Sequence, residues 1–288
     1  MTMTDAIAAY GLQKNYKDFT LRDVSITLPW GQVMGFVGEN GAGKTTTIKA
    51  LLGVINRDAG DVRLLGLPME GNEKALKEQI GVVLAEGQFH DSLTLGGIRK
   101  ILKNIYTTWD DALFETLCRQ FSLPDKKPYK GFSTGTKRKA AIVAALAHHP
   151  RLLILDEPTS GLDPVVREEM LDLFLDFMQK DDHAILFSSH ITGDLDKIAD
   201  SITFLHRGQV IFSRSREDLS EKMGLLKCGS TAFQSLDKSH VLRIRKSAFD
   251  VEALVDNRPF YAGRYPELLM QPATTEEIML FYVRGESL

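Results

Sequence analysis

Eight residues, GENGAGKT from Gly38 to Thr45, match the phosphate-loop pattern G-x-x-x-x-G-K-[ST] in full. Glycines in such a loop let backbone N–H groups turn inward around a phosphate, and the helix that follows adds its positive N-terminal end. An apolar run at Val33–Val37 precedes the loop, and a helical stretch at Lys44–Leu52 follows it. This strand–loop–helix context argues against a chance glycine-rich turn. The loop is therefore predicted to bind a nucleoside triphosphate. The residues predicted to contact it are Gly38, Glu39, Asn40, Gly41, Ala42, Gly43, Lys44, Thr45 and Thr46.

A second stretch, LLILDEP from Leu152 to Pro158, has the composition of a buried parallel strand followed by two acids. Asp156 emerges at the carboxyl end of that strand, where α/β sheets bind ligands. There it is expected to hold Mg²⁺ together with Thr45, whose hydroxyl belongs to the phosphate loop, while Lys44 faces the β- and γ-phosphates. Glu157 is placed to polarise an attacking water. An acidic pair after a strand also serves as a helix cap, but the phosphate loop favours the catalytic interpretation.

Composition excludes several classes of protein. The 288 residues carry 35 Lys and Arg against 38 Asp and Glu, a formal net charge of -3, so no nucleic-acid partner is expected. The short basic clusters Lys137–Lys139 and Arg243–Lys246 are interpreted as a solvated helix face and a charged strand end. The only two cysteines, Cys118 and Cys228, lie in unrelated contexts, which is typical of a reducing cytosol. Neither a signal peptide nor an apolar run of about 18 residues is apparent, so a membrane role is expected to need a partner.

The strand and helix patterns predict an α/β core with an all-helical insertion. Strands are expected at 60–66, 80–84, 152–155, 184–188, 202–206 and 209–212, in addition to those around the phosphate loop. Strand signals disappear between about residues 86 and 150, where helical patterns dominate. We therefore predict an ATP-binding domain over residues 1–215, with its helical subdomain at about 86–150, and a small C-terminal accessory domain over residues 216–288.

The motif order GENGAGKT, FSTGTKRK, LLILDEPTSGLDP and ILFSSH resembles that of the ATP-binding-cassette (ABC) family over residues of about 5 to 212. The resemblance implies an α/β P-loop NTPase core of the ABC ATPase type, with ATP and Mg²⁺ as its cofactors. It also implies that the Ser133 hydroxyl and the Gly135 N–H reach ATP held by the phosphate loop of a second, head-to-tail subunit. Ser133-Thr134-Gly135-Thr136 departs from the usual Ser-Gly-Gly-Gln, but it keeps the serine and the second glycine.

Three further positions resemble functional residues of the family. Asp163 lies in a stretch that resembles the family's loop along the dimer interface, and His190 resembles the histidine that contacts the γ-phosphate. Tyr16 resembles the aromatic residue that stacks on adenine, with Phe19 as a nearby competitor. A purely structural role is the alternative for two of these residues. Ser133 could serve as a helix cap, and Tyr16 could pack against a strand.

One loop departs from the family pattern. Ala85 stands where the family carries a glutamine that senses the metal or the attacking water. Glu86, the next residue, is our first candidate for a substitute, and Gln88 is the second. This departure concerns how the nucleotide state reaches the helical subdomain rather than whether ATP binds.

The resemblance favours the ATP-hydrolysing subunit of an ABC transporter, paired with a second such subunit, expected to be identical, and with a separate transmembrane permease. It would act as a peripheral subunit at the cytoplasmic face of the membrane. The C-terminal TTEEIMLFYVRGE is similar to the tail of exporter ATPases for drugs, antibiotics and peptide toxins. The alternatives are a soluble ABC-type ATP switch acting on ribosomes or DNA, and a small-molecule kinase, which needs neither FSTGTKRK nor the Asp163 loop.

Overall fold

The structure, a computed structural model, describes residues 5–86 and 88–287, and its internal contacts divide them into two units. The first unit ends at Ser213 and the second begins at Arg214. This division falls inside a strand, β10 (Gln209–Ser215), two residues before the domain boundary predicted from the sequence.

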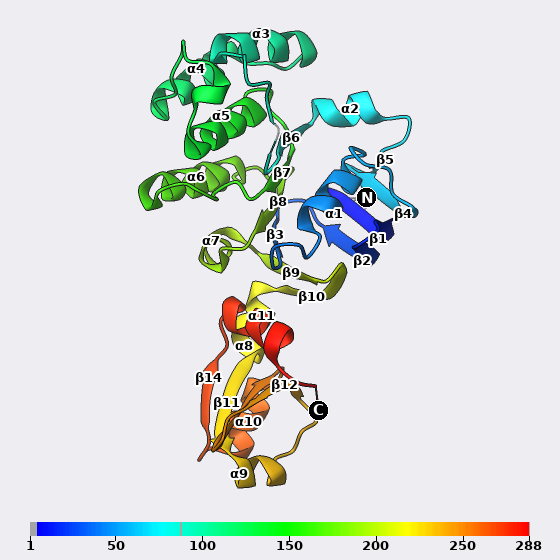
Figure 1. The fold of residues 1–288 in the computed structure, drawn as a ribbon, viewed down its shortest axis with the longest axis vertical. Helices are drawn as coiled ribbons and strands as arrows, with labels where there is room; N and C mark the ends of the chain where they lie inside the picture. The colour runs from blue at the N-terminus through cyan, green and yellow to red at the C-terminus, as the bar shows by residue number, and fades with distance from the viewer. Residues whose placement is uncertain (1–4, 87, 288) are drawn as a thin grey trace. The chain divides into compact units, whose positions relative to one another are not determined.

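The first unit is built on a sheet with the strand order β10-β9-β3-β8-β7-β6 (Figure 1). Its other strands are β3 (Val33–Val37), β6 (Ile80–Val83), β7 (Leu152–Asp156), β8 (Ala184–Ser189) and β9 (Ser201–His206). β3 pairs in parallel with β8 and β9, and β7 pairs in parallel with β6 and β8. Every residue of β3, β7 and β8 is buried, which explains their continuous apolar runs. The phosphate loop and Glu157 therefore follow parallel strands that end at the same edge of the sheet.

A second, antiparallel sheet has the order β2-β1-β4-β5. Its strands are β1 (Ile7–Asn15), β2 (Thr20–Leu28), β4 (Ala59–Leu64) and β5 (Leu67–Pro68). The buried residues Leu12, Leu21 and Leu64 share one hydrophobic cluster with Ile48 and Leu51 of α1 (Lys44–Leu51). This packing anchors the helix that begins at the phosphate loop.

The remaining helices of the first unit include a group of three that forms the helical subdomain (Figure 1). These three are α3 (Leu95–Ile105), α4 (Asp111–Gln120) and α5 (Thr134–Leu146). Thr94, Asp110 and Ser133 each cap one of them by accepting a hydrogen bond from the backbone N–H three residues on. The others are α2 (Glu73–Glu78), a 3-10 turn at Tyr129–Gly131, α6 (Pro164–Phe177) and α7 (Thr192–Ile198). Within residues 5–86 and 88–287, no helix combines the length and the apolar character needed to cross a membrane.

The second unit is a small α/β domain on an antiparallel sheet of order β12-β13-β11-β14. Its elements are α8 (Arg216–Lys222), β11 (Gly224–Gly229), α9 (Ser230–Ser235), β12 (Val241–Lys246), β13 (Asp250–Val255), α10 (Arg258–Arg264), β14 (Leu269–Pro272) and α11 (Thr275–Arg284). Leu226, Val251 and Tyr261 lie in its hydrophobic core. Thr274 and Glu277 form a reciprocal capping box at the start of α11, which explains why the TTEEIMLFYVRGE segment becomes a helix there.

Candidate active site

The phosphate loop lines a cavity of about 630 Å³ at the end of β3. Gly43 has a φ of +110°, and a Cβ at this position would lie 2.7 Å from the Phe19 ring, so only glycine fits the turn into α1. The Lys44 side chain is buried, and its Nζ donates a hydrogen bond of 2.7 Å to the Gly38 carbonyl. The loop thus holds its own lysine facing inward. The predicted residues that line this cavity are Tyr16, Glu39, Asn40, Gly41, Gly43, Lys44, Thr45, Thr46 and Glu157.

Oxygen ligands from β7 and from α1 meet at the same edge of the sheet. The Thr45 hydroxyl donates to Asp156 Oδ2 at 2.7 Å, and the Ser188 hydroxyl donates to Asp156 Oδ1 at 2.6 Å. The Asp156 carboxylate is fully buried, and these two hydroxyls fix its orientation. Mg²⁺ in nucleotide sites is held by one or two such oxygen ligands together with phosphates, so the set fits this ion. Ser188 was not singled out from the sequence, because nothing in FSSH distinguishes its hydroxyl from that of Ser189.

The Glu157 carboxylate joins the phosphate-loop lysine to His190. Its Oε1 lies 3.3 Å from Lys44 Nζ, and its Oε2 lies 2.6 Å from His190 Nδ1. A carboxylate only accepts hydrogen bonds, so the imidazole N–H is the donor in the second contact. The Glu157 side chain is 15% exposed, which leaves it accessible from the cavity while most of it is shielded from bulk water.

Ser133 and Gly135 lie outside this cavity. Ser133 is exposed at the N-terminus of α5, where its Oγ accepts a hydrogen bond from the Thr136 N–H at 3.1 Å. A Cβ on Gly135 would lie 3.3 Å from the Gly161 carbonyl, so the first turn of α5 runs beside the loop that contains Asp163. Asp163 is itself exposed and caps α6 by accepting from the Val166 N–H at 3.1 Å. The structure thus brings these predicted residues close to one another on α5 and the α6 loop, and not to Lys44 of the same chain.

Both candidates for adenine stacking line the cavity. Tyr16 is 47% exposed, and Phe19 is half-buried against the core. A backbone hydrogen bond of 2.8 Å from the Tyr16 N–H to the Phe19 carbonyl holds the two in one turn. The geometry therefore keeps Tyr16 and Phe19 both available, and the choice between them stays a prediction.

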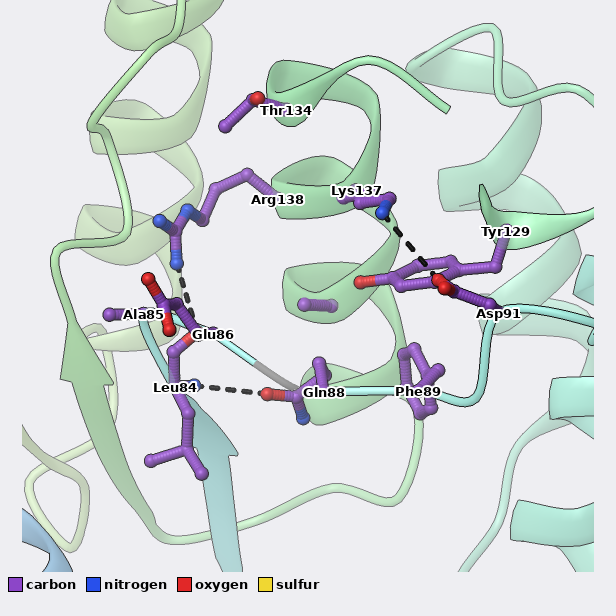
Figure 2. A pocket seen from close by; sticks show the side chains of 11 residues that line it. Leu84, Ala85, Glu86, Gln88, Phe89, Asp91, Tyr129, Thr134, Lys137 and Arg138 are labelled. Carbon is purple, nitrogen blue, oxygen red and sulfur yellow. Dashed lines mark hydrogen bonds and ion pairs between the residues drawn. The ribbon is translucent and has the colours of Figure 1, made fainter. Parts of the chain in front are cut away.

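The loop after β6 faces two directions. Ala85 lines both the phosphate-loop cavity and a second pocket of about 270 Å³ beside α5, whereas Glu86 and Gln88 line only the second pocket (Figure 2). Gln88 accepts a hydrogen bond from the Leu84 N–H and donates one to the Val82 carbonyl, each 3.0 Å long. The Gln88 side-chain amide thereby pairs with backbone groups at the end of β6. Glu86 does not line the cavity of Lys44 and Thr45, so its predicted role at the metal stays a prediction without a supporting contact.

Arg138 corrects the interpretation of Lys137–Lys139 as a solvated helix face. The side chain is only 8% exposed, because α5 turns it toward β6 and β7 on the same side as the buried Ala141 and Ala145. Its Nη1 donates to the Leu84 carbonyl at 2.9 Å and to the Asp156 carbonyl at 3.4 Å. Lys137, by contrast, lies over the Tyr129 ring and 3.8 Å from Asp91. The sequence of three consecutive basic residues does not show which of their side chains faces the core.

Comparison with known proteins identifies the family. A model of the family described as ABC transporter matches residues 21–160. The ABC transporter ATP-binding protein YtrB of Bacillus subtilis (strain 168) is 32% identical over 202 residues, which cover 70% of this chain and 69% of that protein. The chain belongs to the ABC transporter ATP-binding proteins. It is therefore an ABC ATPase, an ATP-binding subunit of a transporter.

One further relative is similar over more of this ABC ATPase, and one solved structure confirms its fold. The bacitracin transport ATP-binding protein BcrA of Bacillus licheniformis is 31% identical over 258 residues, covering 86% of this chain and 79% of BcrA. A solved structure of an ATP-binding subunit of an ABC transporter is 28% identical and superposes with a TM-score of 0.68. It covers 74% of this chain and 91% of the solved one. These similarities confirm the α/β fold class of the ABC ATPase expected from the sequence.

Proposed function

We propose that two copies of this ABC ATPase close head to tail around two Mg-ATP, and that this movement drives a separate membrane permease. The observation that carries the proposal is the separation of two groups of residues within one chain. Lys44 and Glu157 line one cavity, whereas Ser133 and Gly135 lie at the exposed start of α5. Backbone N–H groups at a helix N-terminus attract anions, so a second copy supplies what the cavity lacks for enclosing a triphosphate.

Each side chain of the cavity has a role that follows from its contacts. Lys44 places a positive charge beside the β- and γ-phosphates, and Thr45 with Asp156 would hold Mg²⁺, which neutralises phosphate charge when bound. Ser188 keeps the Asp156 carboxylate oriented for this task. Glu157 polarises the attacking water and accepts its proton. His190 donates to the second oxygen of that carboxylate and thereby directs the free lone pairs of Glu157 into the cavity.

We expect a helix from the permease to bind in an apolar groove of about 590 Å³ on the first unit. The groove lies between the end of α1, helix α2, strand β6 and the end of α3, and so joins the α/β core to the helical subdomain. Val54 and Ile105, both large and apolar, lie on its walls and are 58% and 57% exposed. Glu73, Lys74, Lys77 and Glu78 form a rim with charges of both signs. An apolar floor with a charged rim suits the apolar face of an amphipathic helix.

We expect Val54→Asp to weaken the pairing with the permease at least about tenfold, because a desolvated charge would face the helix in the centre of the groove. The measurement is recovery of a multi-span membrane protein when the tagged chain is purified from detergent-solubilised membranes. Leu175→Asp is the matched control, since Leu175 lies on α6 and is 40% exposed. Both variants should melt within a few degrees of the natural chain.

The outcome of this purification also tests the proposed function itself. A membrane protein recovered in equal amount with the natural chain, but not with Val54→Asp, supports a peripheral subunit at the cytoplasmic face. Recovery only with ribosomes or DNA would contradict the transporter proposal and favour a soluble ATP switch.

The proposed cargo is a drug, an antibiotic or a peptide moved out of the cell. Support comes from BcrA, which is named for bacitracin transport and resembles this chain into the second unit. The permease recovered by the purification provides the test, because the lining of its transport path has to match such a cargo. A path lined for a small inorganic ion would contradict this part of the proposal.

A further inference from the structure

The peptide bond between Asp156 and Glu157 is held from both sides. On one side, the Glu157 N–H donates to the Ser188 carbonyl at 3.1 Å and lies 3.3 Å from the Ser188 hydroxyl. On the other side, the Asp156 carbonyl accepts from Arg138 Nη1 at 3.4 Å. The same Nη1 donates to the Leu84 carbonyl at 2.9 Å, and Figure 2 shows the guanidinium reaching from α5 to that residue. Arg138 therefore connects α5 with the ends of β6 and β7.

The backbone that is held in this way is unfavourable by itself. Glu157 has a φ of +53°, in the left-handed region that residues with a Cβ seldom adopt. Such a conformation persists only where the surroundings fix it, and it is frequent at functional sites. The fixed Asp156–Glu157 peptide plane and this φ together set the direction in which the Glu157 side chain leaves the backbone, and the contacts with His190 and Lys44 then fix its carboxylate.

A guanidinium is a costly choice for this position if its only task is packing. Arg138 is only 8% exposed. Among the residues that the structure describes, its Nε has no hydrogen-bond partner. Burial lowers the pKa of Arg138, while the negative charges of Asp156 and Glu157 act to raise it. An apolar side chain of similar length would fill the same space without the desolvation cost.

We propose that Arg138 is a positioning residue that holds the Asp156–Glu157 peptide, and through it the Glu157 carboxylate, in the orientation that ATP hydrolysis requires. The proposal rests on the proposed role of Glu157 as the base. Because Ser133 and Gly135 occupy the start of the same helix, Arg138 also ties the end of α5 that meets the partner's ATP to the hydrolytic centre of its own chain. The Leu84 carbonyl extends this link to the neighbouring Ala85.

The test separates positioning from packing. We expect Arg138→Met to lower kcat about tenfold or more while KM for ATP stays within about twofold, because a small misplacement of a reacting group costs rate rather than binding. Arg138→Lys should recover only part of kcat, since a single ammonium lacks the planar fork. Arg138→Ala should regain activity when millimolar ethylguanidinium is added, which a residue needed only for packing would not show. Lys137→Met, one residue earlier on α5, is the matched control and should keep the natural kcat.

Each outcome decides the proposal. A natural kcat in Arg138→Met, a KM raised more than about tenfold, or no response of Arg138→Ala to ethylguanidinium would overturn it. If Arg138→Met does not fold, the Arg138→Lys variant is measured instead. An unchanged kcat in Arg138→Lys would overturn the proposal, and a reduced kcat at unchanged KM would support it. Glu157→Gln is measured in the same assay. Natural turnover in Glu157→Gln refutes the base itself, whereas loss in Glu157→Gln with natural turnover in Arg138→Met refutes only the positioning role.

Discussion

We expect the Glu157→Gln variant to hydrolyse ATP at least about 100-fold more slowly than the natural chain while still binding ATP. Glutamine keeps the size of the side chain but cannot accept the proton of the attacking water, and loss of a general base typically costs a factor of about 10² to 10⁴. Lys44, Thr45 and Asp156 remain in place, so the phosphates keep their contacts. The measurement is phosphate release at saturating ATP, together with ATP affinity measured separately.

A matched control for this variant is Glu70→Gln, which makes the same chemical change at the surface. The Glu70 side chain is 64% exposed in an ion pair with Arg57, remote in sequence from Asp156 and Glu157. It should keep the natural turnover, since exposed ion pairs contribute little. Natural turnover in Glu157→Gln would show that another group accepts the proton.

We expect Lys44→Met to lose ATP affinity by about 10- to 100-fold, and turnover with it. In the proposed site the lysine charge faces the phosphates, and a charge-assisted contact in a buried site is worth about 1.5–3 kcal/mol. Removing it also leaves the Glu157 carboxylate facing an anionic ligand without the positive charge now 3.3 Å away. Methionine preserves most of the buried volume of the side chain, so the effect reports the charge.

Titration calorimetry with Mg-ATP measures this change directly. Lys49→Met is the matched control, because Lys49 lies in the last turn of the same helix. It should bind ATP as the natural chain does. Equal affinity in Lys44→Met and Lys49→Met would mean that the phosphates bind elsewhere.

The parts of the site that lie in continuous motifs could be predicted from the sequence. The residues Gly38 to Thr46 form one loop, and Asp156 with Glu157 directly follows a buried strand, so their chemistry and spacing are visible in the letters. The strands of the central sheet were also predictable, because parallel strands that are buried on both faces are continuous apolar runs.

Contacts between segments that are distant in the sequence could not be predicted in this way. Ser188 meets Asp156 across two neighbouring strands, and Arg138 reaches Leu84 from a helix 54 residues away. The path of the loop that carries Glu86 and Gln88 depends on hydrogen bonds to β6 rather than on any periodicity. The individual elements of the second unit could not be predicted from the sequence, because short strands that alternate with short helices give no sustained period.

A composite ATP site built by two copies makes the mass of Glu157→Gln in solution depend on Mg-ATP. We expect about 32.1 kDa without nucleotide and about twice that mass with it, with one ATP bound per chain. Adding Ser133→Ala to this variant should shift the mass back toward that of a single chain, because the partner's ATP loses the hydroxyl at the start of α5. A single-chain mass for Glu157→Gln with ATP bound, or an unchanged dimer in the double variant, would contradict the composite site.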